Sequence, residues 1–297
     1  MKILKLLIFL PLLAISLTAI SQTKDTKLLE KAKKGDADAQ YELALKFVNK
    51  QQNDSALYWL RKSAENNNAE AQFALGLLYN GSGHLLDVDL KKAFYWFKKS
   101  AEQGLPKGQY NVAMLYYQGK GVAVDKKQCY YWMKKAAEGG HQEAGFKLGQ
   151  MYYYGDCTEQ NKEKALKAWI KCAQQGSADA AFNVATMYYN GDGIPVNIAK
   201  SSFWYKKILS KVSGEAAFGL SNYFFEGKKV KEDKKEAFFW MKVSAEKNYP
   251  KSYYALGLMY YSGTGTLINK KDGVFWLKKA AKQGNKKAQE FINKYHL

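Results

Sequence analysis

The spacing of the tryptophans is the feature that most limits how this chain can fold. Successive tryptophans are separated by 37, 36, 37, 35, 36 and 36 residues. The seven positions are Trp59, Trp96, Trp132, Trp169, Trp204, Trp240 and Trp276. A fixed period of this length is typical of repeat arrays, in which each unit packs on its neighbours. The sequence therefore predicts a repeat protein, although a length of 297 residues would by itself suggest about two globular domains.

Each repeat contains two apolar segments with helical spacing. One is "AQFALGLLYNGSG" at residues 71–83, and the other is "LKKAFYWFKKSAEQG" at residues 90–104. Glycines bound both segments, and Pro106 and Pro250 fall where the first segment of a unit begins. The first turn of a helix tolerates proline. We therefore expect each unit to be a helix A, a short loop and an antiparallel helix B.

Alignment of the units shows alternating columns of small and aromatic residues. The first small column of helix A is Ala39, Ala71, Gly108, Ala144, Ala180, Ala216 and Ser252. The second is Ala44, Gly76, Ala113, Gly149, Ala185, Ser221 and Gly257. The aromatic column between them is Tyr41, Phe73, Tyr110, Phe146, Phe182, Phe218 and Tyr254, and a later one is Tyr79, Tyr116, Tyr152, Tyr188, Phe224 and Tyr260. The small column of helix B is Ala56, Ala93, Cys129, Ala165, Ser201, Ala237 and Gly273.

This alternation favours close helix stacking, because small residues let backbones approach and aromatic residues fill the gaps. The tryptophan lies three residues after the helix B small column, where we predict that it fills the same space in every unit. In the fourth repeat Ala168 takes that position and Trp169 follows it. We expect local repacking there.

The columns, the Gly-x-Gly turns and the Asp-x-x-Lys-Ala and Trp-x-x-Lys-Ala-Ala patterns resemble Sel1-like repeats. They are seen in "GKGVAVDKKQCYYWMKKAAEGG" (119–140) and "GKKVKEDKKEAFFWMKVSAEKN" (227–248). The resemblance spans about residues 35 to 284. It implies an all-α, right-handed α-solenoid of about seven helix-turn-helix repeats with a concave surface, used as an adaptor for other macromolecules. Exported members of this family are similar in being envelope regulators or host-contact factors.

The predicted boundaries follow the period. They are a signal peptide at 1–21, the start of an N-terminal helix at 22–34, a degenerate first repeat at 35–67, further repeats at 68–104, 105–140, 141–176, 177–212, 213–248 and 249–284, and a capping helix at 285–297.

The first 21 residues have the pattern of a secretory signal peptide. Lys2 and Lys5 precede an apolar run from Leu6 to Ile20, and Ala19-Ile20-Ser21 fits a small-x-small cleavage site. The run is short for a membrane span. We predict cleavage and a periplasmic or secreted protein with no stable membrane span; a retained anchor is the alternative.

The chain is strongly basic, and nearly all of this charge is lysine. Removal of Lys2 and Lys5 with the signal peptide lowers the formal net charge from +19 to +17. Arg61 is the only arginine, and bidentate recognition of phosphates and bases favours arginine. We therefore predict a solvated lysine-rich surface and no nucleic-acid partner. Electrostatic binding of an anionic polymer is an alternative.

No residue pattern points to catalysis, a metal or a cofactor. His84, His141 and His296 lack metal-ligand spacing and are predicted to be solvated. Ser244 and Lys247 match the Ser-x-x-Lys signature of penicillin-interacting enzymes, but Ser244 falls in a small packing column. Some cysteine-rich relatives are associated with β-lactam binding, and this chain lacks their paired cysteines. We predict a non-enzyme; a β-lactam or cell-wall hydrolase is the alternative.

The three cysteines differ in their predicted environments. Cys129 and Cys172 fall in small columns and are predicted to be buried. Cys157 replaces the second glycine of its turn, so we expect it to be exposed, as a free thiol or as an intermolecular link between otherwise monomeric chains. A Cys157–Cys172 bridge is not expected, because the two lie near opposite ends of helix B.

Two helix A columns vary in character along the repeats. The first is Glu42, Ala74, Asn111, Lys147, Asn183, Gly219 and Ala255. The second is Leu45, Leu77, Met114, Gln150, Thr186, Asn222 and Leu258. They share one helix face, because residues three apart are neighbours on a helix.

In the middle repeats these variable columns become polar. The predicted partner-binding residues are Asn111, Lys147, Asn183, Gln150, Thr186 and Asn222. Such a stripe suits an extended peptide, whereas the alternative is that these side chains are simply solvated. We predict an exported, non-catalytic scaffold that binds a protein or peptide on its concave helix A face, in envelope regulation or assembly.

Overall fold

The structure is a computed structural model that describes residues 25–297, so the predicted signal peptide at 1–21 lies outside the described residues. Within that range the chain is α-helical with two 3₁₀ turns and no strand. The all-α solenoid of paired helices is confirmed. The chain divides into two compact units, Met1–Gln160 (unit 1) and Asn161–Leu297 (unit 2).

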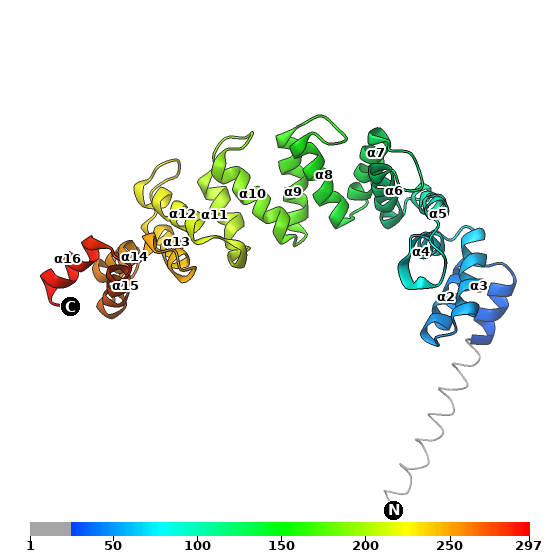
Figure 1. The fold of residues 1–297 in the computed structure, drawn as a ribbon, viewed down its shortest axis with the longest axis horizontal. Helices are drawn as coiled ribbons and strands as arrows, with labels where there is room; N and C mark the ends of the chain where they lie inside the picture. Colours follow the sequence, from blue (N-terminus) through cyan, green and yellow to red (C-terminus); the bar gives the residue numbers. More distant parts are fainter. Residues whose placement is uncertain (1–24) are drawn as a thin grey trace, which may run out of the picture. The chain divides into compact units, whose positions relative to one another are not determined.

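Unit 1 is a series of antiparallel helices in which each helix packs against the next one in sequence (Figure 1). Residues 25–33 are helical. The helices that follow are α2 (Ala37–Asn49), α3 (Asn53–Glu65), α4 (Ala69–Tyr79), η1 (Ser82–His84), α5 (Leu90–Glu102), α6 (Pro106–Gln118), α7 (Lys126–Glu138) and α8 (Gln142–Tyr154).

Unit 2 continues the same alternation of helices. It contains α9 (Lys162–Gln174), α10 (Ala178–Asn190), α11 (Ile198–Lys206), η2 (Leu209–Lys211), α12 (Gly214–Glu226), α13 (Lys234–Glu246), α14 (Lys251–Ser262), α15 (Lys270–Lys282) and α16 (Lys286–Tyr295). Each helix again packs against its successor, and α16 packs on α15 at the C-terminal end.

Short polar side chains start most of these helices. An N-cap side chain accepts a hydrogen bond from a backbone N–H of the first turn, which satisfies a donor that the helix itself leaves unpaired. The capping residues are Asp36, Asn68, Asp89, Asp125, His141, Asn161, Ser177, Asn197, Ser213, Asp233, Asn269 and Asn285. Helix α6 instead begins with Pro106, as the sequence predicts.

The small columns let helix A and helix B of a repeat approach closely. A Cβ added to Gly76 on α4 would lie 2.5 Å from the ring of Phe97 on α5. A Cβ added to Gly257 on α14 would lie 2.8 Å from Leu277 Cγ on α15. Because these contacts leave no room for a methyl group, the small residues are a packing requirement.

The tryptophans are not equivalent, contrary to the expectation that each fills the same space. The side chains of Trp132, Trp169, Trp204 and Trp240 are buried, whereas those of Trp59, Trp96 and Trp276 are half-buried. Trp169 lies one residue later on its helix, as the alignment predicts. It takes the helix position that other repeats fill with Phe97, Met133 or Leu277, all of them fully buried.

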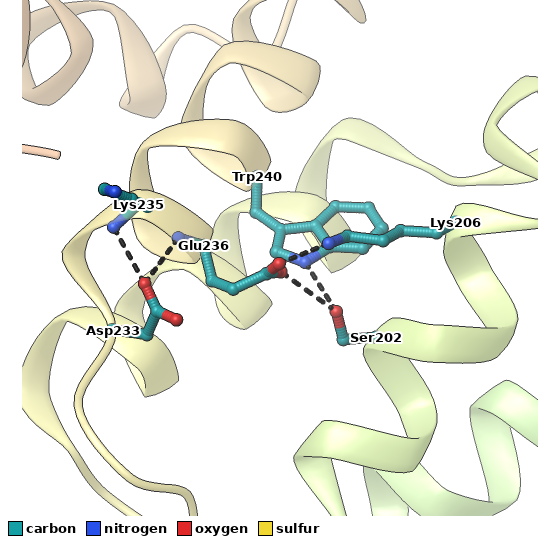
Figure 2. A network of polar contacts seen from close by, with 6 residues as sticks. All are labelled: Ser202, Lys206, Asp233, Lys235, Glu236 and Trp240. Carbon is teal, nitrogen blue, oxygen red and sulfur yellow. Dashed lines mark hydrogen bonds and ion pairs between the residues drawn. The ribbon is translucent and has the colours of Figure 1, made fainter. Parts of the chain in front are cut away.

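Trp240 joins two neighbouring B helices through a partly buried polar network (Figure 2). Its indole N–H on α13 donates a 2.9 Å hydrogen bond to the hydroxyl of Ser202 on α11. The Ser202 hydroxyl also lies 3.4 Å from a Glu236 carboxylate oxygen, and the same carboxylate forms an ion pair with Lys206. Trp240 is buried, so its indole N–H depends on the Ser202 hydroxyl for a hydrogen-bond acceptor.

We expect the Ser202→Ala substitution to lower the free energy of unfolding by about 1–3 kcal/mol, because it leaves the buried indole N–H without an acceptor. Urea-induced unfolding of the mature chain measures this loss. In a Trp240→Phe background the same substitution should cost much less. An equal cost in both backgrounds would show that the hydrogen bond is not the cause.

His141 is not solvated as predicted but is half-buried at the start of α8. Its Nδ1 accepts a 3.2 Å hydrogen bond from the Ala144 N–H, and its ring stacks on Tyr110 with centroids 4.6 Å apart. The Tyr110 hydroxyl donates to Glu143 at 2.7 Å. Burial lowers the pKa of His141, which matches its use as a neutral hydrogen-bond acceptor.

This lowered pKa gives the stability a defined pH dependence. The unfolded chain takes up a proton at His141 near pH 6.5, before the folded chain does. The contribution of His141 is therefore fully present above about pH 6.5 and is lost as the pH falls below that value. We expect His141→Asn, which keeps a capping side chain but cannot titrate, to reduce the loss of stability between pH 7.5 and pH 5. Urea midpoints at the two pH values test this, and an unchanged loss would contradict it.

Candidate functional site

Unit 1 contains a pocket of about 220 Å³ on its helix A face, which we call the unit 1 pocket. It is bounded by α6, α7, α8 and the turn after α8. Its lining residues are Met114, Tyr117, Met133, Lys147, Gln150, Met151, Tyr154 and Asp156. Three methionines give it an adaptable apolar surface, and the remaining side chains place polar groups around that surface.

An ion pair fixes one side of the unit 1 pocket. Asp156 lies 3.2 Å from Lys126 Nζ at the start of α7, and it also accepts a hydrogen bond from Tyr117. Burial raises the pKa of Asp156, but the hydrogen bonds from Tyr117 and Lys126 outweigh this effect and hold the pKa below its ordinary value. Asp156 is therefore a carboxylate at neutral pH and anchors the turn to α7.

Helix α8 contributes polar groups to the unit 1 pocket that the fold does not use. Lys147 and Gln150 are half-buried on α8. Neither side chain has a hydrogen bond or ion pair with a residue that the structure describes. A ligand in the pocket would therefore meet an ammonium group and an amide that can both form new hydrogen bonds.

Unit 2 contains a larger pocket of about 520 Å³, which we call the unit 2 pocket. It lies between α12, α13, α14 and α16. Its lining residues are Asn222, Phe225, Met241, Ala255, Leu258, Met259, Tyr261, Ser262, Thr264, Phe291 and Tyr295. The Lys234 ammonium lies over the ring of Phe225, one of the lining residues, 3.7 Å from its centroid. This pocket is mainly aromatic and aliphatic, with few polar groups.

The two variable columns of helix A contribute to both pockets. In unit 1 they supply Met114, Lys147 and Gln150, and in unit 2 they supply Asn222, Ala255 and Leu258. Six members of the columns that vary in sequence therefore line these two pockets. Three of the six predicted binding residues, Lys147, Gln150 and Asn222, line a pocket.

The other three predicted binding residues lie elsewhere. The Asn111 amide donates to the Lys107 carbonyl oxygen on its own helix at 2.9 Å. The Thr186 hydroxyl lies 3.0 Å from the Tyr205 hydroxyl. Asn183 is half-buried on α10 and does not line the unit 2 pocket. Their role in binding stays a prediction.

The aromatic residues around the pockets were not among the predicted site residues. Tyr117, Phe225 and Tyr261 each follow directly after a member of the second aromatic column, so the pairs "YY" and "FF" were a visible signal. The first residue of each pair packs between helices, and the second is left to line a pocket. Phe291 and Tyr295 come from the terminal helix α16, which lies outside the columns and gave no such signal.

The one nucleophile signature in the described residues is used by the fold. Ser244 is fully buried, and its hydroxyl donates to the Gly214 carbonyl oxygen at 2.7 Å. The Lys247 ammonium donates to the Ser210 carbonyl oxygen at 3.0 Å. The two side chains are therefore engaged with different backbone carbonyls, and Ser244 has no access to a substrate.

Within residues 25–297, no group of three or more His, Cys, Asp or Glu side chains is placed to hold a metal ion. None of the helices described there is long and apolar enough to cross a membrane.

The comparisons with known proteins agree with this repeat architecture. The family model described as Sel1 repeat matches seven consecutive segments, at 37–68, 69–105, 106–141, 142–177, 178–210, 214–249 and 250–285. Among curated proteins, none matches the chain.

Solved structures include similar repeat proteins. A protective antigen of uropathogenic Escherichia coli strains with an SLR fold is 29% identical, with a TM-score of 0.62; the match covers 90% of this chain and 58% of that one. This chain thus spans little more than half of that relative. A Sel1 repeat protein from Oxalobacter formigenes is 27% identical over 91% of this chain and 89% of that one, with a TM-score of 0.38.

Proposed function

The chain belongs to the Sel1 repeat family, whose members are typically protein-interaction scaffolds, and from this premise we propose that it is an exported, non-catalytic scaffold for a protein partner. The partner binds through extended segments on the helix A face, and each unit receives side chains in its own pocket. The observation that carries the proposal is that the variable columns line both pockets. The other columns are used for packing and leave little freedom for function.

The chemistry of the pockets describes the kind of segment that they fit. The unit 1 pocket offers methionine side chains beside the Lys147 ammonium and the Gln150 amide. It suits a medium-sized apolar side chain next to an acidic side chain or a backbone carbonyl. The unit 2 pocket is larger and lined by aromatic residues, which suits a bulky apolar anchor.

Export is supported by the sequence of residues 1–21 alone. A signal peptide would deliver the scaffold to the periplasm or beyond, where its partner would be a protein of the envelope or of the surroundings. We place its role in envelope regulation or assembly on that basis.

The test is a crosslinking pull-down from envelope extract with the mature chain as bait. The pocket variant carries Lys147→Ala and Gln150→Ala. A matched control carries Lys127→Ala and Gln128→Ala, which remove the same residue types from α7 outside the pocket. We expect the pocket variant to lose at least about tenfold in capture of a discrete partner, because pocket residues at the centre of an interface dominate its affinity. The control should capture as much as the wild type.

Salt dependence separates this proposal from the electrostatic alternative that the +17 charge of the mature chain raises. If all three proteins captured many anionic species equally, and if this capture fell steeply with salt, the charge would be responsible and the pocket would not. Equal capture of one discrete partner by both variants would place the binding surface away from the unit 1 pocket.

A further inference from the structure

The position of the second glycine in the Gly-x-Gly turn after helix A lies against the first turn of a B helix earlier in the chain. A Cβ added to Gly121 would lie 2.0 Å from the Leu90 carbonyl oxygen, at the start of α5. A Cβ added to Gly265 would lie 1.9 Å from the Lys234 carbonyl oxygen, at the start of α13. The backbone at this turn position is left-handed in each described repeat that has the turn, at Gly83, Gly121, Cys157, Gly193, Lys229 and Gly265. A left-handed backbone and a close backbone neighbour both favour glycine.

Cys157 occupies this turn position in the fourth repeat. Its φ is +61°, so a residue with a side chain is held where most repeats have glycine. The ion pair between Asp156 and Lys126, 3.2 Å long, shows that the turn lies against the start of α7. The Cys157 side chain must therefore lie beside the first turn of α7.

Cys129 lies on that first turn, three residues after Lys126. It occupies the small column of helix B, where the other repeats have Ala, Ser or Gly, and its side chain is fully buried. The Cys157 side chain is half-buried instead of exposed, and its thiol donates to the Asp156 carboxylate at 3.8 Å. Burial and the neighbouring Cys157 thiol both raise the pKa of Cys129, so the two side chains lie close together. The two cysteines thus lie on the two sides of one contact, between the turn after α8 and the first turn of α7, which we call the joint. The corresponding contacts of the other repeats have no cysteine on either side.

We propose that Cys129 and Cys157 are a disulfide-forming pair that fastens the turn after α8 to the start of α7 within unit 1. The joint is next to the unit 1 pocket, because Asp156 precedes Cys157 and Met133 lies one helical turn after Cys129. The disulfide therefore connects two sides of that pocket. This inference does not depend on the proposed partner binding.

The chemistry needs an oxidant of the disulfide class, either a small molecule or a protein. The half-exposed Cys157 thiolate attacks one sulfur of the oxidant, forms a mixed disulfide and releases the first thiolate. The Cys129 thiolate then attacks the Cys157 sulfur, forms the Cys129–Cys157 bond and releases the second thiolate. The two thiol protons are taken up by the released thiolates, and the two electrons leave with the oxidant, which becomes two thiols. Burial raises the pKa of both cysteines, so the exchange is faster at mildly alkaline pH.

The test starts from the mature chain, refolded at pH 8.5 in a buffer of reduced and oxidised glutathione. The protein is then unfolded, alkylated and digested with trypsin for mass spectrometry. We expect the peptide Gln128–Lys134 to be linked to the peptide Leu148–Lys162, and only the thiol of Cys172 to be alkylated. In a fully reduced sample all three thiols should be alkylated. The oxidised protein should melt about 5–10 °C above the reduced protein.

Two variants serve as controls that are expected to fold. Cys129→Ala introduces the residue that most repeats have in the small column, and Cys157→Gly introduces the residue that most repeats have in the turn. Neither variant should contain the linked peptides, and neither should gain thermal stability on oxidation.

Three outcomes would overturn the proposal. They are three alkylated thiols in the oxidised wild type, a Cys157–Cys157 link between two copies of the chain, and a melting temperature that oxidation leaves unchanged. The second outcome would instead support the intermolecular link that the sequence analysis considered for Cys157.

Discussion

The close approach of helix A to helix B is the contact on which the rest of the repeat depends. Gly257 and Gly273 face each other across this contact, and a Cβ added to Gly273 would lie 3.0 Å from the Gly257 carbonyl oxygen. Ser221 occupies the same helix A column as Gly257, and its hydroxyl donates to the Ala237 carbonyl oxygen at 2.6 Å. Helices held at this distance leave fixed spaces between repeats, which the aromatic columns fill. The two variable columns are free of this requirement, and six of their members line the unit 1 and unit 2 pockets.

The fold could be predicted because this packing is repeated, so that each column appears in the sequence about seven times. A single repeat would not have shown which small residues are required by a neighbouring helix and which occupy positions where a larger residue would also fit. The errors came where one position departs from its column for a local reason. His141 was predicted to be solvated because histidine in a turn usually is, but the stacking on Tyr110 buries it at a helix start. The contact between His141 and Tyr110 depends on one particular pair of side chains, so it cannot be recognised from a pattern that repeats along the sequence.

The candidate site could be predicted only in part, since sequence variation identifies a surface without showing its shape. Lys147 and Gln150 were correctly placed on one helix face, but their position beside Met133 depends on how α7 and α8 pack. Asn111 belongs to the same column as Lys147, yet its amide is used by its own helix. The contribution of α16 to the unit 2 pocket could not be inferred, because this helix follows the last repeat and has no equivalent to align with.

Many of the surface lysines pack against aromatic side chains. Several ammonium groups lie over aromatic rings, among them Lys234 over Phe225, Lys206 over Phe239 and Lys279 over Trp276. Lysine stems cover apolar rings while the charged ends stay in water, so these residues shield aromatic surface that would otherwise be exposed. Other lysines form ion pairs, as Lys126 does with Asp156. A high positive charge in this chain is therefore partly a consequence of having many aromatic residues near the surface. Charge of this kind attracts anionic partners without distinguishing them. Under the proposed function, discrimination between partners would come from the pockets, where Lys147 lies beside methionine and tyrosine side chains.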